Sequence, residues 1–363
     1  GKGQLAVLTD PKVTKRYYDD VRFLAQTIGS ETVLVHLEPD LWGYFLQMGS
    51  PDPANVKVAT ASASADCAGQ PENAAGFAGC LIGILRKYAP NARIALHASP
   101  WATNIDAVSN TDTSVDVTVE AQKLATHLAK LGALDGDFLV VDLSDRDAGF
   151  DQKNGEDTWM DATNTKLPHF HQAFAWVKAL GAATKMPILW WQLPLGNAQQ
   201  NDTTNHWKDN RVEYFFSHTD EVAQSNVIGI LFGSGEPQQT NPETDGGFFV
   251  SRAKDYFAAG GVAPICPLSG CMSGTGATRR TPPGAGSWGS RPCGGRSPAG
   301  PGREAAERRA ARAGWGLSRG CRRHPTPGRS WRPARARRDR WRNRSGNAGG
   351  CVAAGVRAGR RDR

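Results

Sequence analysis

Carboxylates follow short apolar runs at three places in this sequence, a placement that suits acid–base chemistry. Glu38 ends the run TVLVHLE, Asp142 ends DFLVVD, and Glu236 follows VIGILF after a Gly-Ser-Gly segment. Paired carboxyl groups supply the general acid and the base or nucleophile of glycoside hydrolysis. We expect Glu38 to be the general acid, because an apolar wall at the end of a buried strand raises the pKa of a carboxyl group. Glu236 is a reserve catalytic candidate.

The second carboxylate group, Asp142, Asp145 and Asp147, surrounds Arg146 in the segment VVDLSDRDAG. On a strand, Asp142 would lie beneath the site, whereas Asp145 or Asp147 on the loop would be the base that activates water. The alternative for these aspartates is a structural network with Arg146 that holds the loop. For Glu38 the alternatives are capping of the following segment or pairing with an arginine.

Four tryptophans near the ends of these runs are candidate sugar-binding platforms, because an indole face stacks on the apolar face of a pyranose: Trp42, Trp101, Trp190 and Trp191. The alternative is a core position, above all for one of Trp190 and Trp191, since neighbours on a strand point to opposite faces. Gln192 and Asn197 would form hydrogen bonds with substrate hydroxyl groups.

Other chemistries lack their usual sequence signals. Carboxylates suit Ca²⁺, but the alternating EF-hand pattern is absent, and His169 with His171 alone is too weak a signal for zinc. No Gly-x-Ser-x-Gly segment is present, as a serine esterase would need. We therefore expect no metal and no cofactor. No apolar run is long enough to span a bilayer, so we expect no membrane partner.

The elements that must position these residues alternate between strand and helix. Near-continuous apolar runs predict strands covered on both faces: 32–38, 92–97, 137–143, 187–193 and 227–232. Around them, helical patterns cover 13–28, 73–88, 115–131, 170–184, 210–225 and 248–259. This alternation predicts an α/β protein with a parallel sheet.

Two α/β architectures compete for this pattern. A doubly wound sheet would usually show a glycine-rich turn after an early strand, and neither G-x-G-x-x-G nor a Walker sequence is present. In a (β/α)8 barrel of the TIM type, the chemistry lies on loops just after the strands, where it lies here. We therefore expect a TIM-type barrel. Five strands are clear, or six if 4–8 is one, so we expect an incomplete barrel whose first two or three units precede Gly1.

Charge divides the chain near residue 262. Residues 1–262 carry 20 basic and 31 acidic side chains, a net charge of −11, whereas residues 263–363 carry 23 arginines, no lysine and 4 acidic side chains, a net charge of +19. The second segment is rich in Gly, Pro, Ala and Ser and has no Phe or Tyr. We therefore predict a catalytic domain over 1–262 and a disordered tail over 263–363.

Two interpretations of the tail compete. Its arginines, interleaved with Trp288, Trp315, Trp331 and Trp341, would bind phosphates and stack on the bases of a nucleic acid. A selected basic tail normally mixes lysine with arginine, however, and an Arg-, Gly-, Ala- and Pro-rich stretch is what GC-rich DNA encodes out of frame. We favour a frameshift or read-through product with no specific nucleic-acid partner. The tail's five cysteines lack the spacing of a zinc site.

The predicted catalytic domain contains two cysteines, Cys67 and Cys80. A pair that brackets a short loop suggests a disulfide in an exported protein, and two free buried thiols are the alternative. The sequence does not predict an oligomeric state.

Taken in order, the segments VLVHLEPDLWGYF, DFLVVDLSDRDAGF, PILWWQLPLGN and GILFGSGEPQQT resemble secreted bacterial (β/α)-barrel glycoside hydrolases of the cellulase type. Glu38-Pro39-Asp40 is similar to the strand-end E-P-D of family 6 cellulases, and Asp145-Arg146-Asp147 to their D-R-D, here in the opposite order. The resemblance implies a secreted cellulase, or endo-β-1,4-glucanase, acting on a β-linked polysaccharide. The alternatives are a carbohydrate-binding barrel without catalysis and a nucleic-acid-binding protein acting through the tail.

Overall fold

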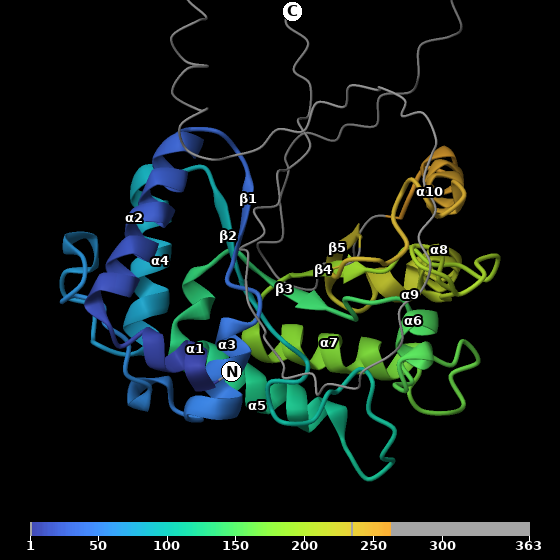
Figure 1. Ribbon diagram of the computed structural model, residues 1–363, viewed down its shortest axis with the longest axis horizontal. Coiled ribbons are helices and arrows are strands. Elements are labelled where there is room, and N and C mark those ends of the chain that lie inside the picture. Colours follow the sequence, from blue (N-terminus) through green and yellow to red (C-terminus); the bar gives the residue numbers. More distant parts are fainter. Residues whose placement is uncertain (1, 234, 263–363) are drawn as a thin grey trace, which may run out of the picture. The chain divides into compact units, whose positions relative to one another are not determined.

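A single parallel sheet organises the part of the chain that the computed structural model describes, residues 2–233 and 235–262 (Figure 1). Its five strands pair in chain order and all run parallel: β1 (Leu34–Leu37), β2 (Arg93–His97), β3 (Phe138–Asp142), β4 (Ile188–Leu193) and β5 (Val227–Phe232). The predicted α/β class and all five clear strands are confirmed. The sixth candidate, 4–8, is wrong, because most of it belongs to a helix.

Helices precede the first strand, fill the connections between the strands and follow the last one: α1 (Lys2–Val7), α2 (Pro11–Ile28), α3 (Leu41–Tyr44), α4 (Ala74–Tyr88), α5 (Val117–Leu131), α6 (Ala148–Lys153), α7 (Phe170–Thr184), α8 (Arg211–Ser217), α9 (Thr219–Ala223) and α10 (Phe248–Ala258). The single helix predicted over 210–225 is divided at His218. The ring nitrogen Nδ1 of this residue lies 2.9 Å from the Ser217 hydroxyl and 3.0 Å from the Tyr214 carbonyl. Such local side-chain bonds compete with continuation of a helix.

Helix α2 illustrates how the sequence sets these elements. Asp10 caps its amino end by accepting a hydrogen bond from the Lys12 amide (2.8 Å), and Pro11 follows as the first helical residue. The residues that the helix buries recur at helical spacing: Thr14, Tyr18, Val21 and Ala25. This stripe faces α4 and the sheet, so amphipathic spacing fixes which side of α2 enters the core.

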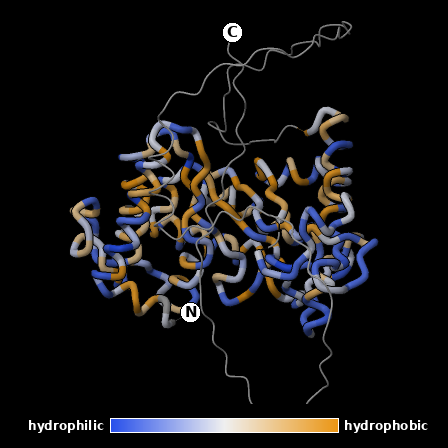
Figure 2. Tube along the Cα trace, turned by 45° about the horizontal axis from the view of Figure 1, so that its top comes forward, coloured by the Kyte–Doolittle hydropathy of each residue, from blue (hydrophilic) through white to orange (hydrophobic). Residues whose placement is uncertain are grey.

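The two faces of the sheet differ in what covers them. One face contributes apolar side chains to a large core shared with α2, α4, α5, α7 and α8: Val35, Leu37, Ile94, Leu96, Leu139, Val141, Ile188 and Trp190. The other face carries a small apolar cluster of strand residues alone: Ala95, Phe138, Val140 and Leu189, with Trp191 packed against it. Hydrophobic and hydrophilic segments alternate along the chain trace (Figure 2). The second face is where polar side chains can gather.

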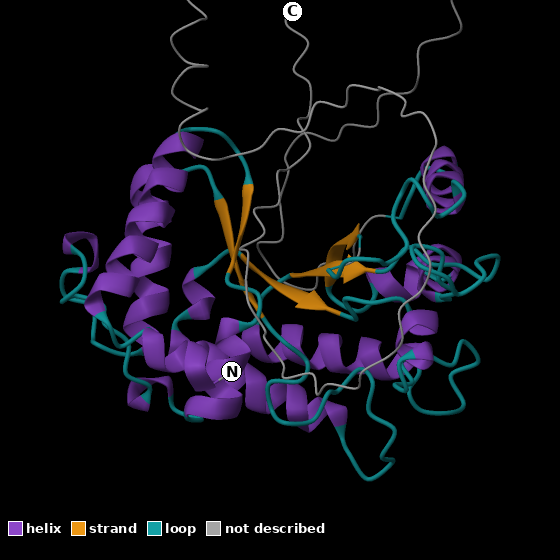
Figure 3. Cartoon of the chain, in the orientation of Figure 1, coloured by secondary structure: helices purple, strands orange, loops and turns teal. Residues whose placement is uncertain are grey.

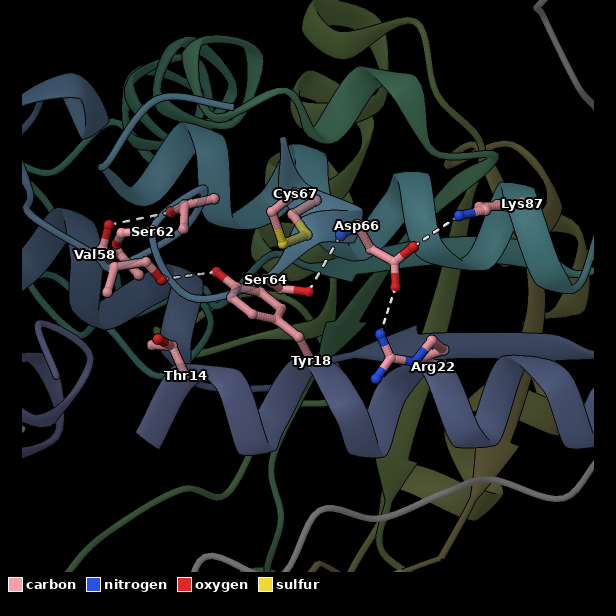
Figure 4. Close-up of a disulfide and its surroundings, with 12 residues drawn as sticks. Thr14, Tyr18, Arg22, Val58, Ser62, Ser64, Asp66, Cys67 and Lys87 are labelled. Atoms are coloured by element: carbon pink, nitrogen blue, oxygen red, sulfur yellow. Dashed lines mark hydrogen bonds and ion pairs between the residues drawn. A yellow bond between two sulfur atoms is a disulfide. The ribbon is translucent and has the colours of Figure 1, made fainter. Parts of the chain in front are cut away.

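A disulfide joins Cys67, at the end of the short 3-10 helix η3 (Ala65–Cys67), to Cys80 of α4 (Figure 4). The structure thus selects the disulfide over two free thiols. Beside it, the carboxylate of Asp66 lies 2.7 Å from Arg22 of α2 and 2.8 Å from Lys87 of α4. These partners hold the pKa of Asp66 below its usual range. The disulfide and the ion pairs together tie the loop before α4 to two helices.

The predicted tail, 263–363, lies outside the described residues, and so do its tryptophans and cysteines. No helix within residues 2–233 and 235–262 has the length and apolar character needed to cross a bilayer.

Candidate functional site

The five strands run parallel (Figure 3), so their carboxyl ends meet at one edge of the sheet. Most of the predicted site residues lie at these ends or just after them in the chain. Glu38 follows β1, Asp142 ends β3, and Gln192 lies within β4. Parallel strands bring such strand-end residues together from distant parts of the sequence. The question is then which of these side chains contact one another.

A chain of three hydrogen-bonded side chains runs across β1, β2 and β3. The ring nitrogen Nε2 of His97 lies 2.9 Å from Oδ1 of Asp142, and Nε2 of His36 lies 3.1 Å from Nδ1 of His97. Because a carboxylate only accepts hydrogen bonds, Nε2 of His97 carries the hydrogen. In the neutral ring, Nδ1 of His97 then accepts from His36. His97 is only 1% exposed, so this arrangement orients Asp142 from within the protein.

Trp191 closes this chain on one side. Its ring meets that of His36 edge to face at a centroid distance of 4.8 Å, and that of His97 at 5.8 Å. Burial, and next the neighbouring His97, lowers the pKa of His36 well below its usual value. His36 is therefore neutral at neutral pH, and an uncharged ring donates to His97.

Asp142 is the electrostatic centre of a wider group of carboxyl groups. Burial raises the pKa of Asp40, of Asp106 and of Asp145, and in each case the charge of Asp142 raises it further. Asp142 is thus close enough to each of the other three carboxyl groups for its charge to act on their pKa values. The group draws on loops after β1, β2 and β3, so the fold assembles it from three segments.

Asp145 has the most clearly perturbed carboxyl of this group. Burial raises its pKa to about 6, with Asp142 and Glu236 adding to the rise and Arg146 opposing it. Arg146 lies 3.6 Å from Asp145 and 3.5 Å from Glu236, so it bridges the loops after β3 and β5. A carboxyl group with this pKa is partly protonated near neutral pH, as a general acid must be.

Glu38 lies at the rim of this group and is tied to helix α2. Its carboxylate accepts a hydrogen bond from the hydroxyl of Tyr17, whose half-buried ring stacks on Phe77 of α4. Burial raises the pKa of Glu38, the Tyr17 hydroxyl lowers it, and nearby Asp40 raises it. Among the described residues, no hydrogen bond joins Glu38 to the His36–His97–Asp142 chain.

Two site residues hold a backbone conformation that favours glycine. Glu38 has φ of 45° and Gln192 has φ of 58°. Gln192 stands at an irregularity in the pairing of β4 with β5, and a Cβ at Gly235 would lie 2.3 Å from its amide nitrogen. Non-glycine residues in this region cost about 1–3 kcal/mol and cluster at functional sites. The strain at both positions turns the strand-end side chains away from regular strand geometry.

Trp101 forms an aromatic pair with Tyr44, at a ring centroid distance of 5.0 Å. Its ring lies so close to Gly43 that a Cβ there would be 2.8 Å from the indole. Tyr44 is near Asp40, whose charge, after burial, raises the pKa of the tyrosine. Both rings remain partly exposed, so this pair fits the predicted role of Trp101 as a platform.

Two predicted platforms are core residues instead. Trp42 is fully buried, donates its indole N–H to the Leu37 carbonyl (2.8 Å), and packs against Phe45 and Phe77. Trp190 is fully buried on the helix-covered face of the sheet. Neither presents an indole face to a sugar, so both assignments are corrected. Trp191, on the opposite face, keeps its candidate role.

Asp147 and Asn197 are also structural. Asp147 is fully buried and accepts hydrogen bonds from the amides of Gly196 (2.9 Å) and Thr240 (2.7 Å). Asn197 is 2% exposed and donates to the Asp245 carbonyl (3.1 Å). A side chain without exposed polar atoms cannot activate water or bind a substrate hydroxyl, so both assignments are corrected.

Several members of the group were not predicted from the sequence: His36, His97, Asp40 as a carboxylate of its own, Asp106, Tyr17 and Tyr44. The histidines carried a usable signal. His36 precedes Glu38 by two residues, and His97 ends the next strand, so a parallel pairing places both on the face that carries the site.

Two further features bear on ligands. Within the described ranges, no three His, Cys, Asp or Glu side chains converge in a way that would hold a metal ion. Two hollows of about 350 and 340 Å³ lie beside α10, and none of the predicted site residues lines them. The candidate site is therefore defined by its contacts, not by those hollows.

Comparison with known proteins adds little. No protein-family model matches the sequence, and no curated protein is similar to it. Among solved structures, the carboxyl transferase domain of Rhizobium etli pyruvate carboxylase is similar at 11% identity, over 68% of this chain and 50% of that chain, with a TM-score of 0.21. The same domain in complex with 3-hydroxypyruvate is similar at 12% identity, over 71% of this chain and 50% of that chain, with a TM-score of 0.22. The chain thus spans about half the length of these structures, and TM-scores this low carry no argument.

Proposed function

We propose that this protein is a glycoside hydrolase acting on a β-linked polysaccharide with a β-1,4-glucan backbone. The observation that carries the proposal is the contrast between Asp142 and Asp145, which leave the same strand end. Asp142 accepts a hydrogen bond from the buried ring of His97, whereas burial raises the pKa of Asp145 to about 6. Two carboxyl groups in such different environments suit the two halves of acid–base catalysis.

In this mechanism Asp145 is the general acid and Asp142 the base. Asp145 gives its proton to the glycosidic oxygen as the bond to the anomeric carbon breaks. Asp142 takes a proton from the water molecule that attacks this carbon, so the leaving sugar gains one proton and the new hydroxyl keeps the other proton of the water. This assignment moves the acid from Glu38 to Asp145. Glu38, held by Tyr17, remains the competing candidate.

His97 and His36 act through Asp142. A carboxylate that must accept a proton from water needs a fixed orientation, and the His97 ring N–H supplies it at 2.9 Å. His36, neutral because burial lowers its pKa, fixes the tautomer of His97. Trp191 covers both rings, and Trp191 with the Trp101–Tyr44 pair offers aromatic surface to the sugar rings.

The architecture proposed for this enzyme is a TIM-type barrel. Sequential strand order, without a reversal, and helices packed on one face are what consecutive units of a (β/α)8 barrel have, whereas a doubly wound sheet covers both faces. The five described β/α units would be consecutive units of such a barrel. Secretion is part of the same proposal, supported by the Cys67–Cys80 disulfide, because disulfides persist mainly in oxidising compartments.

The test is release of reducing ends from soluble β-1,4-gluco-oligosaccharides by the full chain and three variants. We expect Asp145→Asn to lower the rate by about 10²–10⁴-fold, the range for loss of a general acid or base. The matched control is Asp135→Asn, which removes an exposed carboxylate before β3, at the opposite end of that strand. Its activity should equal that of the parent.

Glu38→Gln separates the two acid assignments. If Glu38→Gln is inactive and Asp145→Asn retains full activity, the acid is Glu38 and the assignment of Asp145 fails. If the parent chain is retained on polysaccharide but releases no reducing ends, the protein is a carbohydrate-binding barrel without catalysis. The nucleic-acid alternative rests on the tail, which lies outside the described residues.

A further inference from the structure

We propose that the preferred substrate of this site is a cationic amino-sugar polymer, a β-1,4-linked glucosamine chain, and not a neutral glucan. The inference rests on the proposed hydrolase and names the charge of its substrate. It places the 2-ammonium group of one sugar beside Asp40, next to the aromatic rings of Tyr44 and Trp101. These three residues are called the Asp40 rim below.

Negative charge at the strand ends is not balanced by positive charge. Six carboxyl groups belong to the site: Glu38, Asp40, Asp106, Asp142, Asp145 and Glu236. Within residues 2–233 and 235–262, Arg146 is the one arginine or lysine that pairs with any of them, and it is shared between two. A neutral sugar leaves this repulsion in place, whereas an ammonium group relieves it.

Asp40 lacks a partner for its carboxylate. Its carboxylate forms no hydrogen bond or ion pair with the described residues and does not cap the helix that begins after it, α3. Burial raises its pKa, and Asp142 is close enough for its charge to raise it further. An exposed, unpaired carboxylate at the edge of the group is therefore available to a ligand.

Two aromatic rings lie beside Asp40. Tyr44 lies one helical turn after Asp40 and pairs with Trp101, so aromatic rings stand next to the unpaired charge. A cation over an aromatic face is stabilised by the ring quadrupole, and a carboxylate beside the ring adds a counter-charge. Combined aromatic and anionic surface is what recognises an organic ammonium group, and the same rings stack on a pyranose.

The distribution of the charges fits an extended polymer. The carboxyl groups are spread over the loops after β1, β2, β3 and β5. Residues 1–262 as a whole carry 20 basic and 31 acidic side chains. A negative surface of this kind raises the association rate of a polycation.

The experiment compares binding of three oligosaccharides of equal length and linkage by isothermal calorimetry with the full chain. They are made of glucosamine, of N-acetylglucosamine and of glucose, so that only the group at C2 changes. We expect the glucosamine oligomer to bind at least about tenfold more tightly than either neutral oligomer, because several charge pairs form together. Raising salt from about 0.05 to about 0.5 M should remove most of this advantage, since it shortens the Debye length to a few ångströms.

Asp40→Asn tests the Asp40 rim itself. The substitution removes one charge without removing a helix cap, so it should fold normally. We expect it to weaken glucosamine binding about three- to fivefold and to weaken glucose-oligomer binding by less, so that the preference between the two oligomers falls. Asp135→Asn, which removes one exposed aspartate at the opposite end of β3, should change neither affinity.

The outcomes separate this inference from the hydrolase proposal. If the glucosamine oligomer binds most tightly and Asp40→Asn reduces that preference, the inference stands, even where no bond is cleaved and the hydrolase proposal fails. If glucose oligomers are hydrolysed and bind as tightly as glucosamine oligomers, the hydrolase stands and the inference is overturned. Equal losses in Asp40→Asn and Asp135→Asn would also overturn it, because the effect would then be general charge and not a site.

Discussion

Asp145 and Asp147 stand two residues apart after β3, and burial raises the pKa of both, yet they belong to different kinds of structure. Asp147 has amide donors on both carboxylate oxygens, from Gly196 and Thr240. Asp145 has a salt-bridge partner at 3.6 Å and faces the charges of Asp142 and Glu236. The first is a satisfied anchor for loops, and the second is an unsatisfied group open to a ligand.

The Asp147 network extends through Asp209. Asp209 accepts hydrogen bonds from the amide of Ala148 (2.7 Å) and from the guanidinium of Arg211 (2.5 Å). The side chains of Asp147, Asp209 and Arg211 are all buried. A raised pKa therefore does not by itself mark a functional group. The hydrogen-bond donors around a carboxylate determine whether it can bind substrate, because a carboxylate whose oxygens already accept bonds from the protein has none left to offer.

Loss of the base should have the greatest effect on turnover. Asp142→Asn removes the base, and we expect turnover to fall about 10⁴-fold, the upper end of the range for such a group. The melting temperature should change little, because the side-chain oxygen of an asparagine at this position can still accept a hydrogen bond from His97. Steady-state kinetics with a thermal melt measures both. A loss of stability in place of a loss of turnover would show that Asp142 is an anchor like Asp147.

The next prediction concerns stability, which should depend on Asp147 and its buried hydrogen bonds. Asp147→Asn leaves one amide donor facing an NH₂ group in a buried site, and we expect the free energy of unfolding to fall by about 3 kcal/mol. Urea unfolding measures this change. Activity per folded molecule should stay near that of the parent, and a selective loss of turnover with unchanged stability would contradict the anchor role.

The pH dependence of the stability of Asp147→Asn provides a second test of the anchor role. Burial and nearby Asp209 raise the pKa of Asp147 to about 7, above its value in the unfolded chain, while the amide of Thr240 opposes the rise. The native state therefore binds more protons than the unfolded state between about pH 4 and about pH 7, so this group's contribution to stability falls as pH rises through that window. Asp147→Asn should flatten the curve there.

A smaller effect tests the hydrogen-bonded chain. His97→Gln removes the ring that orients Asp142, and we expect kcat to fall about 10- to 100-fold, as for other orienting partners, with KM nearly unchanged. His36→Gln should have a weaker effect in the same direction, since His36 acts through His97. A rise in KM with unchanged kcat would mean that the histidines bind substrate and do not position the base.

The sequence predicted the framework well because the relevant signals are local. Apolar runs located all five strands, and amphipathic spacing located most of the helices around them. It did not predict which tryptophan of Trp190 and Trp191 faces the core. Alternation gives two faces, but the choice between them depends on where the helices pack.

The site was harder to predict for a related reason. Asp145 and Asp147 are equivalent in the sequence, and only loops some fifty and ninety residues away, at Gly196 and Thr240, make them different. The His36–His97 contact likewise depends on the register of β1 against β2. Local spacing marked both histidines as residues near strand ends, but it did not specify their contact or the partners of Asp147.

Charged neighbours of Asp145 should shift its pKa, and with it the pH dependence of activity, by a small amount. Because Asp145 must be protonated to act as the acid, activity should fall as pH rises through about 6, the pKa of this group. Arg146 lowers that pKa, so Arg146→Gln should move the alkaline limb of the pH–rate profile upward, by about half to one pH unit for a partly exposed pair. Glu236 raises the same pKa, so Glu236→Gln should move the limb downward.

Opposite shifts from two neighbouring substitutions are hard to produce by general damage to the site. A structural role for Asp145, like that of Asp147, would leave the position of the limb unchanged in both variants, because an anchored carboxylate does not take part in the reaction. Shifts of the same sign would assign the limb to another group, with Glu38 the first to test, since burial raises its pKa as well. The two profiles therefore decide whether the environment around Asp145 acts on chemistry or only on the fold.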